Sequence, residues 1–138
     1  MSHDPTPAAT IHSFEEKYQL CRAPVVRETV RAVLGSDLPN GYTTVRQADQ
    51  LAGQLQVRNG DLLLDLGAGR AWPGSHIAQA TGCGLISSDL PMEALVVARH
   101  NLAALRRDTL TEALCADGRR LPFGDAVFDA VCHADVLC

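Results

Sequence analysis

The chain has 138 residues, of which 46 % are apolar and 20 % are charged, and its formal net charge at pH 7 is -4. This balance is typical of a globular domain with a hydrophobic core and excludes a disordered chain. The acidic net charge disfavours nucleic acid as a partner. No apolar run approaches the roughly 18 residues that span a bilayer, and the polar start is unlike a signal peptide. We therefore expect a cytoplasmic protein without membrane contact.

The five cysteines are scattered along the chain without a C-x-x-C pair. Cys132 and His133 are neighbours, and adjacent residues of a strand point to opposite faces of a sheet. This pattern does not bring metal ligands together, so we expect unpaired thiols and no metal site.

The N-terminal third of the sequence predicts helices. We expect a flexible tail over residues 1–10, followed by apolar residues at helical spacing over 11–34. Pro24 interrupts that stretch and should divide it into two short helices, and Gly35 is a plausible stop.

A third helix is indicated by the pair Thr44 and Gln47, which matches a capping box, in which each side chain bonds a backbone N–H group at the helix start. The apolar residues that follow lie on one helical face, and the helix should end near Val57. Residues 11–57 thus form an N-terminal helical extension.

From residue 58 the pattern changes to alternating strands and helices. Residues 62–66 form a short apolar run before glycines, as a strand buried on both faces would. The further elements that we expect are a helix over 75–80, a strand over 85–88, a helix over 91–107, a strand over 112–116 and a strand over 127–132. This alternation predicts an α/β domain over 58–138, a Rossmann-like parallel sheet of about four strands with helices on both faces.

A glycine-rich loop directly follows the first strand. Gly67 and Gly69 allow a sharp backbone turn and leave room for a ligand to approach the main chain. A dinucleotide-binding loop would have a third glycine at the position of Trp72, which weakens that interpretation. A phosphate-binding P-loop would have Lys and Ser or Thr where the chain has Ser75 and His76, so that interpretation fails.

The start of this loop resembles the first motif of class I S-adenosylmethionine (SAM)-dependent methyltransferases. The residues that carry the resemblance are Leu64-Asp65-Leu66-Gly67-Ala68-Gly69. The resemblance implies SAM as cofactor, with the methionine end held by the loop and its amino group facing Asp65, directly or through water. The third glycine that is usual in the family is Ala71 here.

Three further segments occur in the order of that family, so the resemblance covers about residues 44–138. It implies that Asp89, at the end of the second strand, bonds the ribose hydroxyls, and that Asp117 bonds the adenine amino group. Residues 121–123 and 128–131 are similar to the segment that leads into the fourth strand. The cofactor-binding residues that the resemblance implies are Asp65, Gly67, Ala68, Gly69, Asp89, Leu90, Asp117 and Gly118.

Each of these side chains also has a purely structural interpretation. Asp65 would cap backbone N–H groups, Asp89 would be the N-cap of the following helix, and Asp117 would be a turn residue. Trp72 would pack in the protein and not stack on the cofactor. These alternatives stay open at this point.

His133 and Asp135 follow the fourth strand, at the sheet edge where ligands bind in open α/β folds. A histidine there would serve as a base on an acceptor hydroxyl or amine, and an ordinary loop role is equally compatible. They are our candidate catalytic residues.

We expect methyl transfer to a small-molecule acceptor. The family fold implies seven strands, so the chain should be a truncated piece whose fourth strand is an exposed edge, open to a second copy or a partner chain. The alternatives are a catalytically silent SAM-binding module and, less favoured, an NAD-binding domain. Neither the acceptor, the oligomeric state nor the natural end of the chain follows from the sequence.

Overall fold

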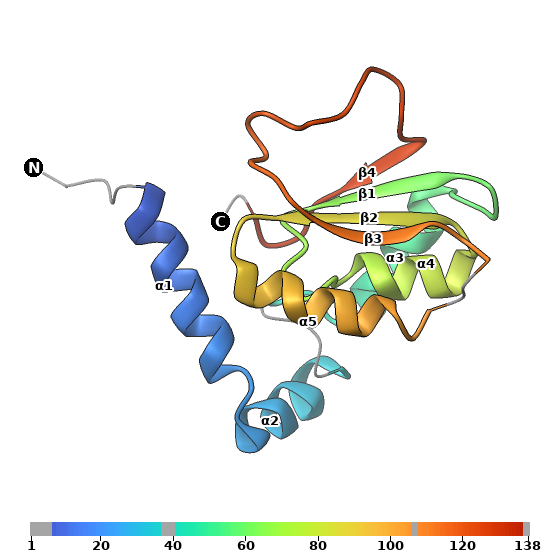
Figure 1. Ribbon diagram of the computed structural model, residues 1–138. Coiled ribbons are helices and arrows are strands. Elements are labelled where there is room, and N and C mark those ends of the chain that lie inside the picture. Colours follow the sequence, from blue (N-terminus) through green and yellow to red (C-terminus); the bar gives the residue numbers. More distant parts are fainter. Residues whose placement is uncertain (1–6, 37–40, 106–107, 137–138) are drawn as a thin grey trace, which may run out of the picture.

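The computed structural model describes residues 7–36, 41–105 and 108–136, and its centre is a four-stranded parallel sheet (Figure 1). The elements in chain order are α1 (Pro7–Leu20), α2 (Pro24–Leu34), α3 (Val45–Leu55), β1 (Leu62–Leu66), α4 (Gly74–Thr81), β2 (Gly84–Asp89), α5 (Met92–Leu102), β3 (Thr111–Cys115) and β4 (Ala130–Cys132).

The strand order β3-β2-β1-β4 places β1 between the two halves of the sheet. Asp65 of β1 pairs with Ser87 of β2 on one side and with Cys132 of β4 on the other. After β1 the chain runs outward through β2 and β3, and it then returns to the opposite side for β4. Ligands of open α/β folds bind at such a reversal, outside the carboxyl ends of the strands. The site is therefore expected beyond the ends of β1, β2 and β4.

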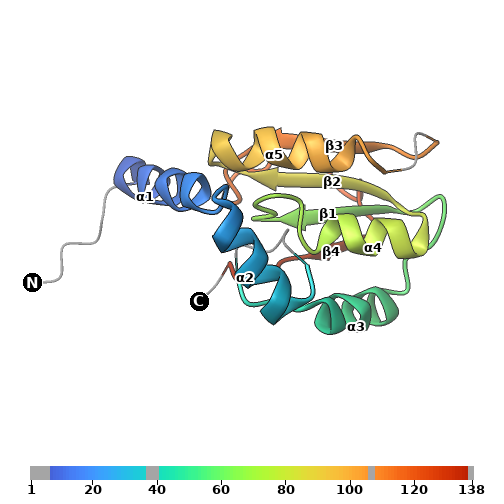
Figure 2. The same ribbon diagram turned by 90° about the horizontal axis from the view of Figure 1, so that it is seen from below.

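The hydrophobic core lies between the sheet and the helices below it. Leu63 and Leu85 project from β1 and β2 and are fully buried. Figure 2 shows α3, α4 and α5 side by side on this face. The core residues are Val57, Leu63, Ala71, Ile77, Ala78, Cys83, Leu85, Ala98, Leu102 and Cys132.

We expected helices on both faces of the sheet, and for the described residues this was wrong. The opposite face is crossed only by the irregular segment that joins β3 to β4 (Figure 1). Pro122 and Gly124 within this segment, together with its turns, account for the lack of a helix there.

The N-terminal elements are two helices, as predicted, and Pro24 occupies the start of the second, where its missing N–H group has no cost. The tail predicted over 1–10 was wrong for residues 7–10, because α1 begins at Pro7; residues 1–6 lie outside the described part. The capping box is confirmed: Thr44 accepts from Gln47 N (3.2 Å), and the Gln47 side chain accepts from Thr44 N (2.9 Å). α1 packs on α5, and Arg22, in the turn after α1, has its Nη2 2.6 Å from Glu93 Oε2 of α5.

Two elements are shorter than predicted. β4 covers only three residues, because Asp129 N donates to Leu62 O and its carboxylate accepts from Leu62 N, which bends the chain at the strand start. α5 ends at Leu102, where the backbone bonds become the i to i−3 type, as from Leu105 N to Leu102 O. Residues 106 and 107, within the predicted helix, lie outside the described part. Among the described helices, none has the length and apolar character of a transmembrane segment.

Candidate functional site

The glycine loop begins where β1 ends. Gly67 N and Ala68 N both donate to Ser88 O of β2, at 2.8 and 3.1 Å. Gly67 and Gly69 have φ angles of 68° and 55°, in the left-handed region that favours glycine. Ala71, at the position where the family that the sequence resembles usually has a glycine, shares this conformation with φ 68°. An L-residue in this region costs roughly 1–2 kcal/mol, so Ala71 carries backbone strain.

Asp65 is fully buried beneath the loop. Its Oδ2 accepts from the backbone N–H of Gly74 at the start of α4 (2.9 Å), and its Oδ1 accepts from Cys132 Sγ (3.5 Å). Burial raises the pKa of Asp65 to about 7, although the hydrogen bond from Gly74 opposes this effect. The structure therefore shows the capping role that the sequence left open for Asp65, and this residue does not line the cavities described below.

Asp89 ends β2 and connects that strand to the loop. Its Oδ2 accepts from Gly69 N (2.7 Å), and its Oδ1 accepts from Leu90 N (2.8 Å). Partial burial raises the pKa of Asp89 above its ordinary value. The interpretation of Asp89 as a helix cap was wrong, because the N-cap of α5 is Pro91.

Asp117 and Gly118 follow β3, and a Cβ atom built on Gly118 would lie 3.4 Å from the side chain of Leu66, the last residue of β1. Asp117 accepts from the Arg119 side chain, with 2.6 Å between Oδ2 and Nη2, and from Arg119 N (2.9 Å). The hydrogen bonds from Arg119 lower the pKa of Asp117 to about 2. Asp117 thus has the turn role that the sequence allowed, and the described cavities do not include it.

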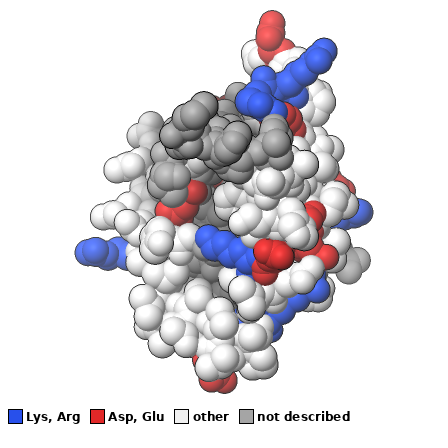
Figure 3. Space-filling view, turned by 90° about the vertical axis from the view of Figure 1, so that its left-hand side faces the viewer, with Lys and Arg blue, Asp and Glu red and all other residues white. Residues whose placement is uncertain are grey.

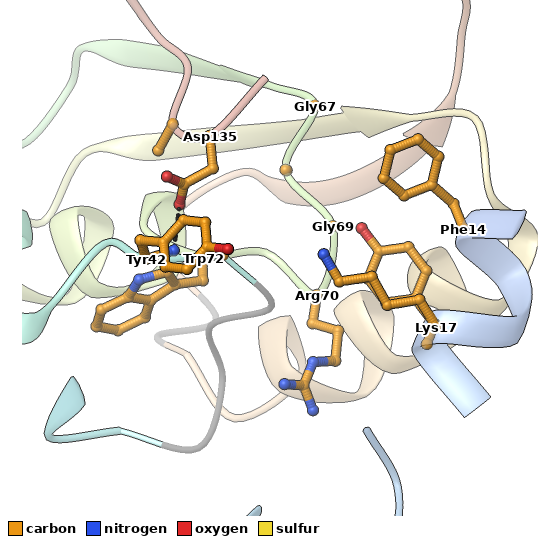
Figure 4. Close-up of a pocket in the computed structure, with 12 residues that line it drawn as sticks. Phe14, Lys17, Tyr42, Gly67, Gly69, Arg70, Trp72 and Asp135 are labelled. Carbon is orange, nitrogen blue, oxygen red and sulfur yellow. Dashed lines mark hydrogen bonds between the residues drawn. The ribbon is translucent and has the colours of Figure 1, made fainter. Parts of the chain in front are cut away.

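Two adjoining cavities, of about 90 and 220 Å³, open over the glycine loop. The larger one reaches Asp89 and Leu90 at the end of β2. The smaller one, drawn in Figure 4, reaches Arg70 and Trp72. Both cavities are lined by Phe14, Tyr18, Gly67 and Asp135. The ends of β1 and β2, the segment after β4 and helix α1 thus enclose one site.

Helix α1 contributes a residue whose place the sequence did not reveal. Tyr18 is buried, and its hydroxyl oxygen lies only 2.9 Å from the position of a Cβ atom built on Gly69. Burial, together with nearby Asp89, raises the pKa of Tyr18. Phe14, four residues earlier, lines the same cavities. Helical spacing showed that the two side chains share a face, but a single sequence does not show what that face covers.

The two candidate catalytic residues are placed differently. His133 is exposed and does not line either of these cavities. Asp135 lines both, and its Oδ2 accepts from Tyr42 N (2.9 Å), Thr43 N (3.2 Å) and Thr43 Oγ1 (3.0 Å). The structure therefore brings one of the two candidates to the site, where it anchors the segment before α3.

Trp72 packs between the loop and this segment. Its side chain is 8 % exposed, its Nε1 donates to Thr43 O (2.9 Å), and its ring lies 5.4 Å from that of His76. Trp72 is therefore packed in the protein, and it also lines the smaller cavity.

The face of the molecule at the left of Figure 1 is the one toward which α1 projects. In the part of it that the structure describes, acidic and basic side chains are interspersed among a majority of uncharged residues (Figure 3). This surface lacks the single-sign basic field that favours binding to a phosphate backbone.

Comparison with known proteins assigns the family. Residues 64–138, more than half of the chain, match the family described as "Methyltransferase domain". The chain belongs to this family, the class I SAM-dependent methyltransferases.

Two curated relatives carry names of methyltransferases that act on small molecules. The chain is 34 % identical over 109 residues to 27-O-demethylrifamycin SV methyltransferase of Amycolatopsis mediterranei, covering 70 % of this chain and 39 % of the relative. It is 28 % identical over 93 residues to sterol 24-C-methyltransferase of Eremothecium gossypii, covering 67 % of this chain and 25 % of the relative. The chain thus spans well under half the length of these relatives.

A solved structure supports the fold. The structure of a SAM-dependent methyltransferase from Thiobacillus denitrificans in complex with S-adenosyl-L-homocysteine has a TM-score of 0.62. The structural match covers 78 % of this chain and 43 % of the Thiobacillus denitrificans chain, at 18 % sequence identity. The likeness shows a shared Rossmann-like architecture.

The residues of the larger cavity fit the cofactor of this family. A carboxylate offers about four acceptor positions, and the backbone bonds from Gly69 and Leu90 use two of those of Asp89. A vicinal pair of ribose hydroxyls needs two acceptors on one such group. Asp89 faces the cavity with the chemistry that this pair requires.

Proposed function

We propose that this chain binds SAM in the two cavities over the glycine loop, and that the protein transfers a methyl group to a small-molecule acceptor. The observation that carries the proposal is the position of Asp89, which lines the larger cavity and is bonded to Gly69 of the loop (2.7 Å). The family assignment and the small-molecule methyltransferases among the relatives support it.

In this proposal the ribose lies against Asp89, and the adenine lies near Leu90 and Pro91 of the larger cavity. The methionine end lies against Gly67, Ala68 and Gly69 in the smaller one. Asp65 supports the loop from below through Gly74 and does not touch the ligand. We assign no adenine contact to Asp117, because Arg119 already holds its carboxylate.

The cofactor supplies an electrophilic methyl group on a sulfonium, and the chain has to orient it and exclude water. Tyr18 and Phe14 of α1 cover the loop and exclude solvent from this side. His133 lies outside the cavities, and we propose no proton transfer through it.

The proposal is tested by calorimetric titration of the purified chain with S-adenosylhomocysteine. Hydrogen bonds to a charged group contribute about 1.5–3 kcal/mol, so Asp89→Asn should weaken binding about tenfold or more. Asp125→Asn, which removes an exposed carboxylate remote from both cavities, is the matched control and should leave the affinity unchanged.

A parallel titration with NAD separates the alternative cofactors. Binding of NAD in place of S-adenosylhomocysteine would overturn the proposal. Binding of S-adenosylhomocysteine that Asp89→Asn leaves unchanged would refute the role of Asp89. A silent binding module would give the same titrations, so it is distinguished by methyl transfer from labelled SAM to an acceptor.

A further inference from the structure

The aromatic residues of the chain are concentrated in one place. The sequence has only one tryptophan, two tyrosines and three phenylalanines. Four of these six side chains line the smaller cavity, and they are Phe14, Tyr18, Tyr42 and Trp72. The other two, Phe123 and Phe128, pack edge to face on one another with 4.8 Å between their ring centroids. A chain with so few aromatic residues has therefore placed most of them around a single site.

Two of the four, Tyr18 and Trp72, are buried in the wall of the cavity. The other two lie at its mouth: Phe14 is 45 % exposed and Tyr42 is 81 % exposed. Figure 4 shows Phe14 on the side of α1 and Tyr42 on the opposite side, next to Trp72. Exposed aromatic side chains on either side of a cavity mark a surface suited to an apolar ligand.

The position of Tyr42 is fixed by its backbone. Asp135 accepts from the N–H groups of Tyr42 and Thr43 and from the Thr43 hydroxyl, and Trp72 donates to Thr43 O. These four hydrogen bonds tie the segment both to the end of β4 and to the glycine loop. The tyrosine ring is thus presented at the cavity mouth by an anchored backbone, which lowers the entropic cost of binding against it.

The charge at the mouth is positive. Lys17, one helical turn after Phe14, lines the same cavity from an exposed position on α1. The other charged groups that line this cavity are Arg70 and the Asp135 carboxylate, so two cations and one anion give it a formal net charge of +1. A cavity lined by an ammonium group and by aromatic rings complements a planar ligand that carries an anionic oxygen.

We propose that Phe14, Lys17 and Tyr42 form the subsite for the methyl acceptor at the exposed mouth of the smaller cavity, outside the part against the glycine loop that we assign to the methionine end. The acceptor in this proposal is a planar aromatic molecule with a phenolic or carboxylic oxygen. This inference rests on the proposed function and adds the class of acceptor to it. Lys17 favours the deprotonated oxygen, whose proton passes to water before transfer. The oxygen then attacks the methyl carbon, so that an O–C bond forms and the S–C bond breaks with both electrons returning to sulfur.

The subsite is tested with 1-naphthoate, a planar aromatic anion, titrated into the chain with and without S-adenosylhomocysteine. Tyr42→Ala removes a stacking ring, and Lys17→Gln removes an exposed charge contact. Each substitution should weaken the binding of 1-naphthoate about fivefold. Two variants serve as controls, because Tyr42→Phe keeps the ring and Arg58→Gln removes a remote exposed cation. Both should bind 1-naphthoate as tightly as the wild-type chain does. The cation 1-naphthylmethylamine should bind far more weakly than the anion.

The proposal is overturned if 1-naphthoate does not bind the wild-type chain, if Tyr42→Ala and Lys17→Gln bind it unchanged, or if the amine binds equally well. These outcomes are separate from the test of the cofactor site. Retained binding of 1-naphthoate without binding of S-adenosylhomocysteine would support the subsite and count against the proposed function. Binding of S-adenosylhomocysteine without binding of 1-naphthoate would support the proposed function and count against the subsite.

Discussion

The Asp89 carboxylate and the backbone N–H of Gly69 are 2.7 Å apart, so the end of β2 and the glycine loop after β1 are joined by a charge-assisted hydrogen bond. Asp65 makes the corresponding bond one layer deeper, to the N–H of Gly74. The two carboxylates therefore hold the two ends of the same loop, but only Asp89 reaches a cavity. Substitution of Asp65 should therefore change the stability of the fold, whereas substitution of Asp89 should change the binding of a ligand.

Stability should depend on pH through Asp65. Its pKa is about 7 in the folded chain and about 3.9 when unfolded, so the folded state binds more protons between these values. Its contribution to stability is complete below about pH 4 and is lost as the pH rises through 7. The difference in free energy of unfolding between Asp65→Asn and the wild type should therefore change in favour of the variant by roughly 2 to 3 kcal/mol as the pH rises from 5 to 8. Urea unfolding at several pH values measures this, and a constant difference would contradict it.

The start of α3 should depend on its capping box. Thr44→Ala removes the acceptor for Gln47 N and should lower the free energy of unfolding by about 1 kcal/mol. Thr29→Ala is the control, because that exposed hydroxyl bonds a carbonyl within α2 and its loss should change stability by less than about 0.5 kcal/mol. Equal effects of the two substitutions in denaturant unfolding would argue against the cap.

Asp135 should act on the segment before α3 and not as a base. Asp135→Ala removes three hydrogen bonds to Tyr42 and Thr43, which should release the segment from Trp72. Because Trp72 is the single tryptophan, its emission should shift to longer wavelength as solvent reaches the ring. Asp135→Asn keeps one acceptor oxygen and should restore part of the wild-type spectrum. An unchanged spectrum for Asp135→Ala would show that the segment holds without this anchor.

The cysteines should differ in reactivity. Burial raises the pKa of Cys83 and of Cys132, and the nearby Asp65 carboxylate raises that of Cys132 further. The thiolate is the reactive form, so both should resist N-ethylmaleimide in the folded chain. Of the four cysteines in the described part of the chain, Cys115 is the exposed one and should be modified first among them. Peptide mass mapping after a timed reaction gives the order, and early labelling of Cys132 would contradict it.

Features set by local chemistry could be predicted from the sequence. The run of leucines before glycines gave β1 its bounds, and the pair Thr44 and Gln47 marked the start of α3, since both patterns act within a few residues. Asp89 was named as a cofactor residue because the resemblance implies an acid at the end of the second strand, and the structure places its carboxylate against the loop. The short β4 was missed, since its length depends on Asp129 bonding Leu62, 67 residues away.

The site was less predictable, because its remaining parts come together only in the tertiary structure. Tyr18 reaches Gly69 only through the packing of α1 on α5. Asp135 bonds Thr43, 92 residues away, and no local pattern indicates that pairing. The adenine contact that the resemblance implies for Asp117 stays a prediction, and in the structure the arginine two residues later holds this carboxylate.

The ion pair between Arg22 and Glu93 joins the turn that follows α1, the helix that covers the glycine loop, to α5, and both side chains are partly exposed. Exposed pairs contribute at most about 1 kcal/mol, and they become weaker as the salt concentration rises. The ionic strength of the solution therefore adjusts how firmly α1 rests over the loop. Dissociation of any ligand beneath it should become faster as salt is added, even for a ligand without charge.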